Sequence, residues 1–171
     1  KVIGELLLTD FSRRGLIDGR GFRLPTISVR PGKANKAASS FMSSIFREPL
    51  QGETANCPVD PDFYHYYLSP RKCVENLIKG AELRAEDLGT NRCMTMPGRL
   101  WTIAQAIEAM TNVAGPEPAT RITWEPQPEL APILKGWQND IRAERALALG
   151  LEADASFEDN IRYFLEDDLP R

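Results

Sequence analysis

Helical and extended segments alternate along this chain, and this alternation restricts its fold more than any other feature. The opening stretch, KVIGELLLTDFSRRG, carries apolar residues at helical spacing and ends with two arginines and a glycine, as helix C-termini do. A β-branched stretch, FRLPTISVR, follows and predicts a strand that stops at Pro31-Gly32. Such alternation is typical of the α/β and α+β classes.

Capping signals place the later helices. We expect a helix over about 37–48, ended by Pro49. A second helix is expected after Ser69-Pro70, where an N-cap hydroxyl precedes a proline at the first helical position. Thr102 and the Ser156-to-Asp159 capping box predict two more.

Apolar patterning predicts the strands and the core. The stretches FYHYYL, RCMTM and RITWEP are strand candidates. The apolar helix faces around Leu77 and Ile107 are expected to be core. The first of these faces is formed by Cys73, Val74, Leu77, Ile78 and Ala81.

Composition excludes several classes of protein. The 171 residues are 42% apolar and 26% charged, as in ordinary soluble domains. A net charge of −3 argues against a broad nucleic-acid surface. No run approaches the roughly 18 apolar residues that a membrane span needs, and no signal peptide is visible. Three scattered cysteines without a C-x-x-C motif favour free thiols in the reducing cytoplasm.

A single histidine, His65, leaves little room for histidine-based chemistry or a metal site. It stands among aromatic residues, and we expect it to be a structural residue on a half-buried strand rather than a catalytic one.

Three stretches, KVIGELLLTDFSRRG, RLPTISVRPG and RALALGLEADASFEDNIRYFL, together resemble the extended short-chain dehydrogenase/reductases, which include the nucleotide-sugar epimerases. The longer stretch LLLTDFSRRGLIDGRGFRLPTISVRPGKANKAASSF resembles the D-erythronate dehydrogenase branch. The resemblance implies an α/β fold: the last parallel strands of a Rossmann domain and a small mixed α/β substrate-binding domain. Residues 1–32 would be the last helix and strand of the Rossmann domain. Residues 33–171 would be the substrate-binding region, with segments that return to the Rossmann sheet.

The resemblance also assigns a role to Lys1. In the family a Tyr-x-x-x-Lys motif opens a long helix, and its lysine is followed by a glutamate; Lys1 and Glu5 match the two. We therefore expect the chain to be the C-terminal half of an enzyme, without the tyrosine and without the glycine-rich turn that binds the dinucleotide. Lys1 would lower the pKa of the tyrosine, which acts as general base, and would contact the cofactor, NAD with NADP not excluded. Without this register, Lys1 would be an ordinary solvated lysine.

Two further groups of candidate residues follow the predicted strand. Pro31 and Gly32 match a turn that runs beside the nicotinamide in the family, although such a pair also simply ends strands. Cations and hydroxyls at the next helix start suit the carboxylate and hydroxyls of a sugar acid, or else form a solvated polar loop. These predicted substrate residues are Lys33, Asn35, Lys36, Ser39 and Ser40, with Arg71 as a weaker anion contact.

Departures from the nucleotide-sugar enzymes favour a small sugar acid, oxidised at its 2-hydroxyl. Where those enzymes carry the arginine of an RDF stretch, this chain has Phe63, Tyr64 and His65. It also has VRPGKANK in place of their Asn-Val-Tyr-Gly-Pro run. Half of a nucleotide-sugar epimerase or dehydratase, and a non-catalytic binding module, remain the alternatives. The resemblance further implies a homodimer for the full-length protein, with the opening helix at the subunit interface.

Overall fold

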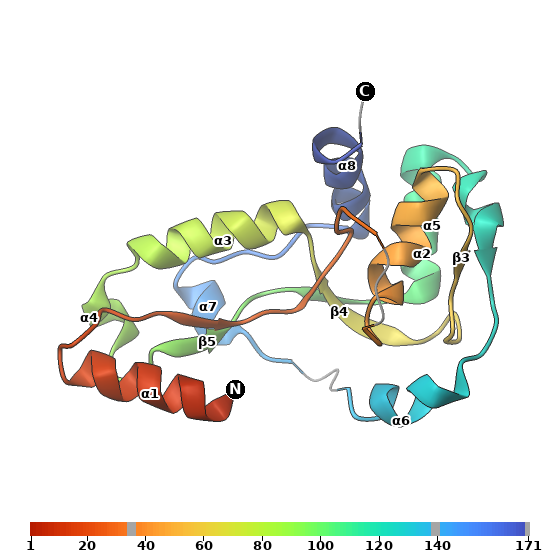
Figure 1. Ribbon diagram of the computed structural model, residues 1–171. Coiled ribbons are helices and arrows are strands. Elements are labelled where there is room, and N and C mark those ends of the chain that lie inside the picture. The colour runs from red at the N-terminus through yellow and green to blue at the C-terminus, as the bar shows by residue number, and fades with distance from the viewer. Residues whose placement is uncertain (34–36, 138–140, 170–171) are drawn as a thin grey trace.

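The computed structural model describes residues 1–33, 37–137 and 141–169, which form an α/β structure of short strands and covering helices (Figure 1). The helices are α1 (Val2–Arg13), α2 (Phe41–Leu50), α3 (Pro70–Glu82), α4 (Ala85–Leu88), α5 (Ile103–Ala114), α6 (Ala131–Leu134), α7 (Glu144–Ala148) and α8 (Phe157–Asp167), with 3-10 turns η1 (Pro118–Arg121) and η2 (Pro128–Leu130). The strands are β1 (Gly21–Arg23), β2 (Thr26–Ile27), β3 (Ala55–Asn56), β4 (Tyr64–Leu68), β5 (Cys93–Thr95), β6 (Arg99–Thr102) and β7 (Ile122–Thr123).

Parallel pairing joins strands that are far apart in the sequence. Strand β1 pairs with β5, with Gly21 opposite Cys93, and β3 pairs with β7. A third sheet has the order β2-β4-β6, in which β2 runs parallel and β6 antiparallel to β4. The predicted α/β class is confirmed.

The stretch FRLPTISVR does not form one continuous strand. It forms β1 and β2, which pair with different partners. The break lies at Leu24-Pro25, because proline has no N–H for a ladder and restricts the residue before it.

Helix α1 rests on β1 through its less apolar side. Leu8 lies so close to Gly21 that a Cβ there would come within 2.9 Å of its Cδ2. Ser12 accepts a hydrogen bond from the Gly19 N–H (3.2 Å). The apolar stripe on the other side of α1 is exposed, and 74% of the surface of Ile3 is accessible to solvent. The stripe therefore has no partner within the described residues.

Helix α2 differs from its prediction at both ends. It begins at Phe41, because the residues before it form a turn in which the Ser40 N–H bonds to the Ala37 carbonyl (2.9 Å). It continues past Pro49 to Leu50. A proline in the last turn removes a single helical hydrogen bond, so the helix tolerates it there.

Helix α3 begins where predicted but buries a different face. Ser69 is the N-cap and accepts from the Lys72 N–H (3.1 Å). The predicted core face around Leu77 is wrong: Val74, Leu77, Ile78 and Ala81 are exposed, and the buried residues are Cys73, Asn76 and Gly80. Phe22 lies directly on Gly80, where a Cβ would come within 2.2 Å of its ring. A close approach at glycine thus decides which face is buried.

The main core lies between α2, α5 and α8 and includes Tyr67 of β4. On α5, Ala106 and Met110 are fully buried and Ile107 packs against the same cluster, as predicted. Phe157 of α8 packs edge-on against Tyr67, with ring centroids 5.2 Å apart. No helix within the described ranges is both long and apolar enough to cross a membrane.

His65 is part of the wall of this core. Its ring is 8% exposed and lies 4.8 Å from the Trp137 ring, between centroids. Its Nε2 is 2.5 Å from the Thr26 hydroxyl oxygen. Burial lowers the pKa of His65 to about 4.

We predict that acid destabilises the fold through His65. The unfolded chain binds a proton near pH 6.5 and the folded chain only near pH 4, so stability falls as the pH drops through this range, by up to about 3 kcal/mol. Because the chain has one histidine, the NMR resonances of its two carbon-bound ring protons belong to His65 and report its pKa directly.

His65→Gln serves as the control. It removes this part of the pH dependence of urea unfolding and leaves the part due to carboxylates. An imidazole that titrates above pH 6 in the folded protein contradicts the prediction.

Candidate functional site

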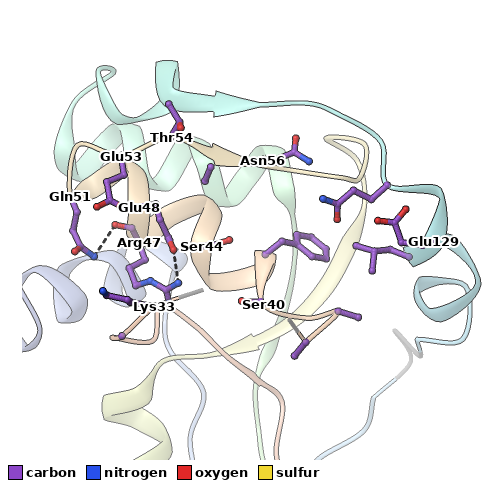
Figure 2. A pocket seen from close by; sticks show the side chains of 17 residues that line it. Lys33, Ser40, Ser44, Arg47, Glu48, Gln51, Glu53, Thr54, Asn56 and Glu129 are labelled. Atoms are coloured by element: carbon purple, nitrogen blue, oxygen red, sulfur yellow. Dashed lines mark hydrogen bonds and ion pairs between the residues drawn. The ribbon is translucent and has the colours of Figure 1, made fainter. Parts of the chain in front are cut away.

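A cavity of about 840 Å³ opens beside α2. Its walls come from the Gly32-Lys33 turn, from α2, from the segment 53–56 that includes β3, and from the segment 127–130 that includes η2. Figure 2 shows polar side chains from each wall around this space. The cavity brings together residues almost 100 positions apart.

The structure places some of the predicted substrate residues at this cavity. Gly32, Lys33 and Ser40 line it, whereas Ser39 does not. Gly32 has φ +95°, a conformation that favours glycine, and a Cβ there would meet no other atom within 4 Å. Asn35 and Lys36 lie outside the described residues, and Pro31 precedes the lining turn.

Helix α2 adds residues that the sequence analysis did not single out. Ser44, Arg47, Glu48 and Gln51 line the cavity at spacings of three and four, so they share one helix face. The sequence holds a signal for them, because polar residues recur at helical spacing on a helix whose other residues are mostly apolar.

Arg47 and Glu48 form a buried ion pair at the base of this face. Arg47 is 4% exposed, and its Nη2 donates to Glu48 Oε1 (2.6 Å). Its Nη1 donates to the Arg30 carbonyl (3.0 Å). The other carboxylate oxygen of Glu48 is buried and has no hydrogen-bond partner among the described residues.

The opposite wall is rich in hydrogen-bond acceptors. Asn56 is fixed there, because its Nδ2 donates to the Glu125 carbonyl (2.8 Å) and its Oδ1 accepts from the Glu125 N–H (2.7 Å). Glu53 and Glu129 also line the cavity, and Figure 2 shows Glu129 on the far side from Lys33 and Arg47. Lys33 and Arg47 thus lie on one side of the cavity with the carboxylates of Glu48 and Glu53 beside them, and Asn56 and Glu129 offer acceptor oxygens on the other side.

Lys1 lies at a different place. It lines a smaller cleft of about 260 Å³ together with Gly21 and Cys93. Glu5, one turn further along α1, accepts from Nε of Arg23 (2.9 Å), and this hydrogen bond lowers the pKa of Glu5. Arg23 is the last residue of β1, so the first turn of α1 is held at the carboxyl end of the parallel strands. Ligands of open α/β sheets bind at that end.

Arg71 points away from the cavity. Its Nε donates to Asp167 Oδ2 (2.9 Å) and its Nη2 to Glu166 Oε2 (2.7 Å). Its guanidinium carbon lies 3.9 Å from the centre of the Tyr163 ring. Arg71 therefore joins α3 to α8, and the structure does not bring it to the other predicted substrate residues.

Over residues 1–33, 37–137 and 141–169, no three His, Cys, Asp or Glu side chains are grouped so that they could hold a metal ion. The three cysteines are buried free thiols. Burial raises the pKa of Cys57 to about 11, so this thiol is neutral at physiological pH.

Sequence comparison supplies the relatives. The chain is 54% identical over 167 residues to a D-erythronate dehydrogenase from Cupriavidus necator. The aligned region covers 98% of this chain and 52% of that protein. It is 41% identical over 169 residues to a D-erythronate dehydrogenase from Haemophilus influenzae, with 99% of this chain and 54% of that protein covered. Over nearly all of its length, the chain is thus similar to two proteins named D-erythronate dehydrogenase. It spans about half the length of the curated relatives it matches. No protein-family model matches it.

Solved structures agree on the fold. A nucleoside-diphosphate-sugar epimerase from Agrobacterium tumefaciens superposes with a TM-score of 0.93 at 46% identity, over 97% of this chain and 48% of that one. An L-threonine 3-dehydrogenase from Trypanosoma brucei superposes with a TM-score of 0.80 at 18% identity, over 97% of this chain and 51% of that one, and this supports the fold alone. The expected resemblance to part of a Rossmann-type short-chain dehydrogenase is confirmed.

We predict that Arg71→Ala weakens the fold. The change removes two ion pairs and a cation–π contact on the surface, which together contribute about 1 kcal/mol. The free energy of unfolding in urea measures the loss. Arg162→Ala is the matched control, because Arg162, on the helix α8 that carries the partners of Arg71, has one exposed ion pair, with Asp159. If both variants lose the same free energy of unfolding, the contacts of Arg71 contribute no more than one exposed ion pair does.

Proposed function

We propose that the chain is the C-terminal half of an NAD-dependent sugar-acid dehydrogenase, similar to D-erythronate dehydrogenase, that oxidises the 2-hydroxyl of its substrate. The observation that supports this most directly is the cavity, where Lys33 lies across from the acceptor oxygens of Asn56 and Glu129. A hydroxy acid has a matching polarity: a carboxylate at one end and hydroxyl donors along the rest. The two relatives named D-erythronate dehydrogenase point to the same substrate class.

In this proposal residues 1–32 complete the Rossmann domain and residues 33–171 form the substrate-binding region. The pairing of β5 with β1 supports a return of the later chain to the Rossmann sheet. The exposed apolar stripe of α1 supports a homodimer for the full-length protein. The free thiols suit a cytoplasmic location.

The residues present fit the nicotinamide end of NAD or, equally, of NADP. Lys1 begins the helix turn that Arg23 holds at the carboxyl end of β1. Gly32 leaves open space where another residue would place a Cβ, so the backbone of the Pro31-Gly32 turn can approach a flat ring closely. When bound, NAD accepts the hydride from the substrate carbon.

Lys1 has an electrostatic role in this mechanism. Its ammonium stabilises the phenolate of a tyrosine supplied by the other half of the protein, so that the tyrosine can take the hydroxyl proton near neutral pH. Lys1 also donates hydrogen bonds to the cofactor ribose. The 171-residue chain alone is therefore proposed to be inactive.

The substrate carboxylate is bound by Lys33, with Ser40 and the residues at the start of α2 next to it. Half of a nucleotide-sugar epimerase is the second candidate, supported by the Agrobacterium tumefaciens structure. The sequence favours the sugar acid, because Phe63, Tyr64 and His65 stand where the nucleotide-sugar enzymes carry the arginine of the RDF stretch. Turnover of sugar acids and of nucleotide sugars by the full-length protein, followed as NADH formation or epimer formation, separates the two.

We predict that Lys33→Ala in the full-length protein raises KM for the sugar acid far more than it lowers kcat. A carboxylate contact that is equal in the ground and transition states affects binding alone. Loss of one charge-assisted hydrogen bond lowers kcat/KM roughly ten- to a hundred-fold. Lys135→Ala, at an exposed lysine outside the cavity, is the control and keeps wild-type kinetics. A kcat/KM within about two-fold of wild type for Lys33→Ala would make Lys33 a solvated residue.

Lys1→Ala is predicted to have the opposite kinetic signature. It leaves the tyrosine with an unlowered pKa, so kcat falls and the pH–rate profile moves to higher pH, while KM changes little. Steady-state kinetics of the full-length protein across pH measure both effects. A profile that keeps its wild-type midpoint would remove Lys1 from the proposed mechanism.

A further inference from the structure

The backbone that leads from β2 to the cavity is held by side chains. The Ser28 N–H still donates to the Leu68 carbonyl of β4 (3.0 Å), and the polar groups that follow it need other partners. Asn160 of α8 donates to the Ser28 carbonyl (2.7 Å), and the Ser28 hydroxyl donates to the Met42 carbonyl (2.7 Å). Ser43 of α2 accepts from the Arg30 N–H at 3.4 Å.

Arg47 makes the last of these contacts before the turn that lines the cavity. Its Nη1 donates to the Arg30 carbonyl, three residues before Lys33. Its Nη2 is engaged by Glu48, so the two arms of one guanidinium join the turn to α2. With 4% of Arg47 exposed, the guanidinium is fixed within the protein.

The turn itself has few means of holding its place. Pro31, Gly32 and Lys33 are all exposed, and the space around Gly32 is open. The position of the turn relative to the cavity therefore depends on the hydrogen bond that holds the Arg30 carbonyl. We propose that Arg47 is a positioning residue that sets the place of Lys33 at the cavity by holding the Arg30 carbonyl.

The chemistry of the two groups explains the residue types. A guanidinium carries its donors in a rigid plane and can donate to a carbonyl and a carboxylate at the same time, whereas the ammonium of lysine is a compact point charge. Glu48 holds the guanidinium so that Nη1 faces Arg30. Neighbouring residues on a helix do not normally face each other, so this pairing requires both side chains to turn toward the cavity base.

The first test does not depend on activity. Amide hydrogen exchange of the full-length protein is measured at Arg30, whose N–H donates to Ser43 Oγ, with the β4 amides as an internal reference. Arg47→Met is expected to speed exchange at Arg30 roughly tenfold and to leave β4 unchanged, because a local anchor is lost. Arg20→Met is the matched control, since Arg20 also bonds a distant carbonyl, that of Leu83, but lies away from the cavity.

The second test is a double-mutant cycle on turnover, which rests on the proposed function. If Arg47 acts through Lys33, then Arg47→Met and Lys33→Ala each raise KM roughly tenfold, and the double variant is roughly tenfold rather than a hundredfold impaired. Arg47→Lys, which keeps the charge but only one contact, is expected to fall between wild type and Arg47→Met, and it replaces Arg47→Met if that variant does not fold.

Two results would overturn the inference: wild-type exchange at Arg30 in an Arg47 variant, or kinetic losses that multiply in full. A wild-type protein that does not oxidise sugar acids refutes the proposed function, and hydrogen exchange then decides the role of Arg47 alone.

Discussion

Between Arg23 and Thr26 the chain changes its strand partner, and both candidate sites depend on that change. Strand β1 pairs with β5 and holds α1, so that the first turn of α1 meets Arg23. Strand β2 pairs with β4 and directs the chain toward α2 and the cavity. The proline between them keeps the two strands from merging into one ladder. Only two residues, Leu24 and Pro25, therefore separate the strand beside Lys1 from the strand that leads to Lys33.

A second, buried interaction fixes the C-terminal helix that this arrangement requires. Asp154 accepts hydrogen bonds from both the N–H (2.7 Å) and the hydroxyl (2.6 Å) of Ser69. Burial raises the pKa of Asp154 despite these bonds, so the contact is maintained against a desolvation cost. It anchors the chain just before α8, whose Asn160 reaches the Ser28 carbonyl. The N-cap of α3 and the path to the cavity are thus connected through one carboxylate.

Local signals in the sequence were sufficient for the parts of the fold that short-range chemistry decides. Ser69 and Thr102 cap their helices as predicted, because a hydroxyl satisfies helix N–H groups within three residues. The prediction of the buried face of α3 was wrong because that face depends on the contact of Gly80 with Phe22. These two residues are almost 60 positions apart in the sequence. The same limit applies to the site. Lys33 and Ser40 follow a recognisable turn, whereas Arg47 gains its importance only from a distant carbonyl.

The buried pair of Arg47 and Glu48 is better explained by geometry than by stability. Burying two charges costs several kcal/mol, and their attraction often does no more than offset that cost. Here the balance is less favourable still, because one oxygen of Glu48 has no partner among the described residues. A well-packed apolar pair would suit the core of α2 at least as well, but it would leave the Arg30 carbonyl without the donor that Arg47 provides. What the charged pair adds is orientation. Glu48 fixes the Arg47 guanidinium on α2 so that it donates to the Arg30 carbonyl, where the turn at the cavity begins.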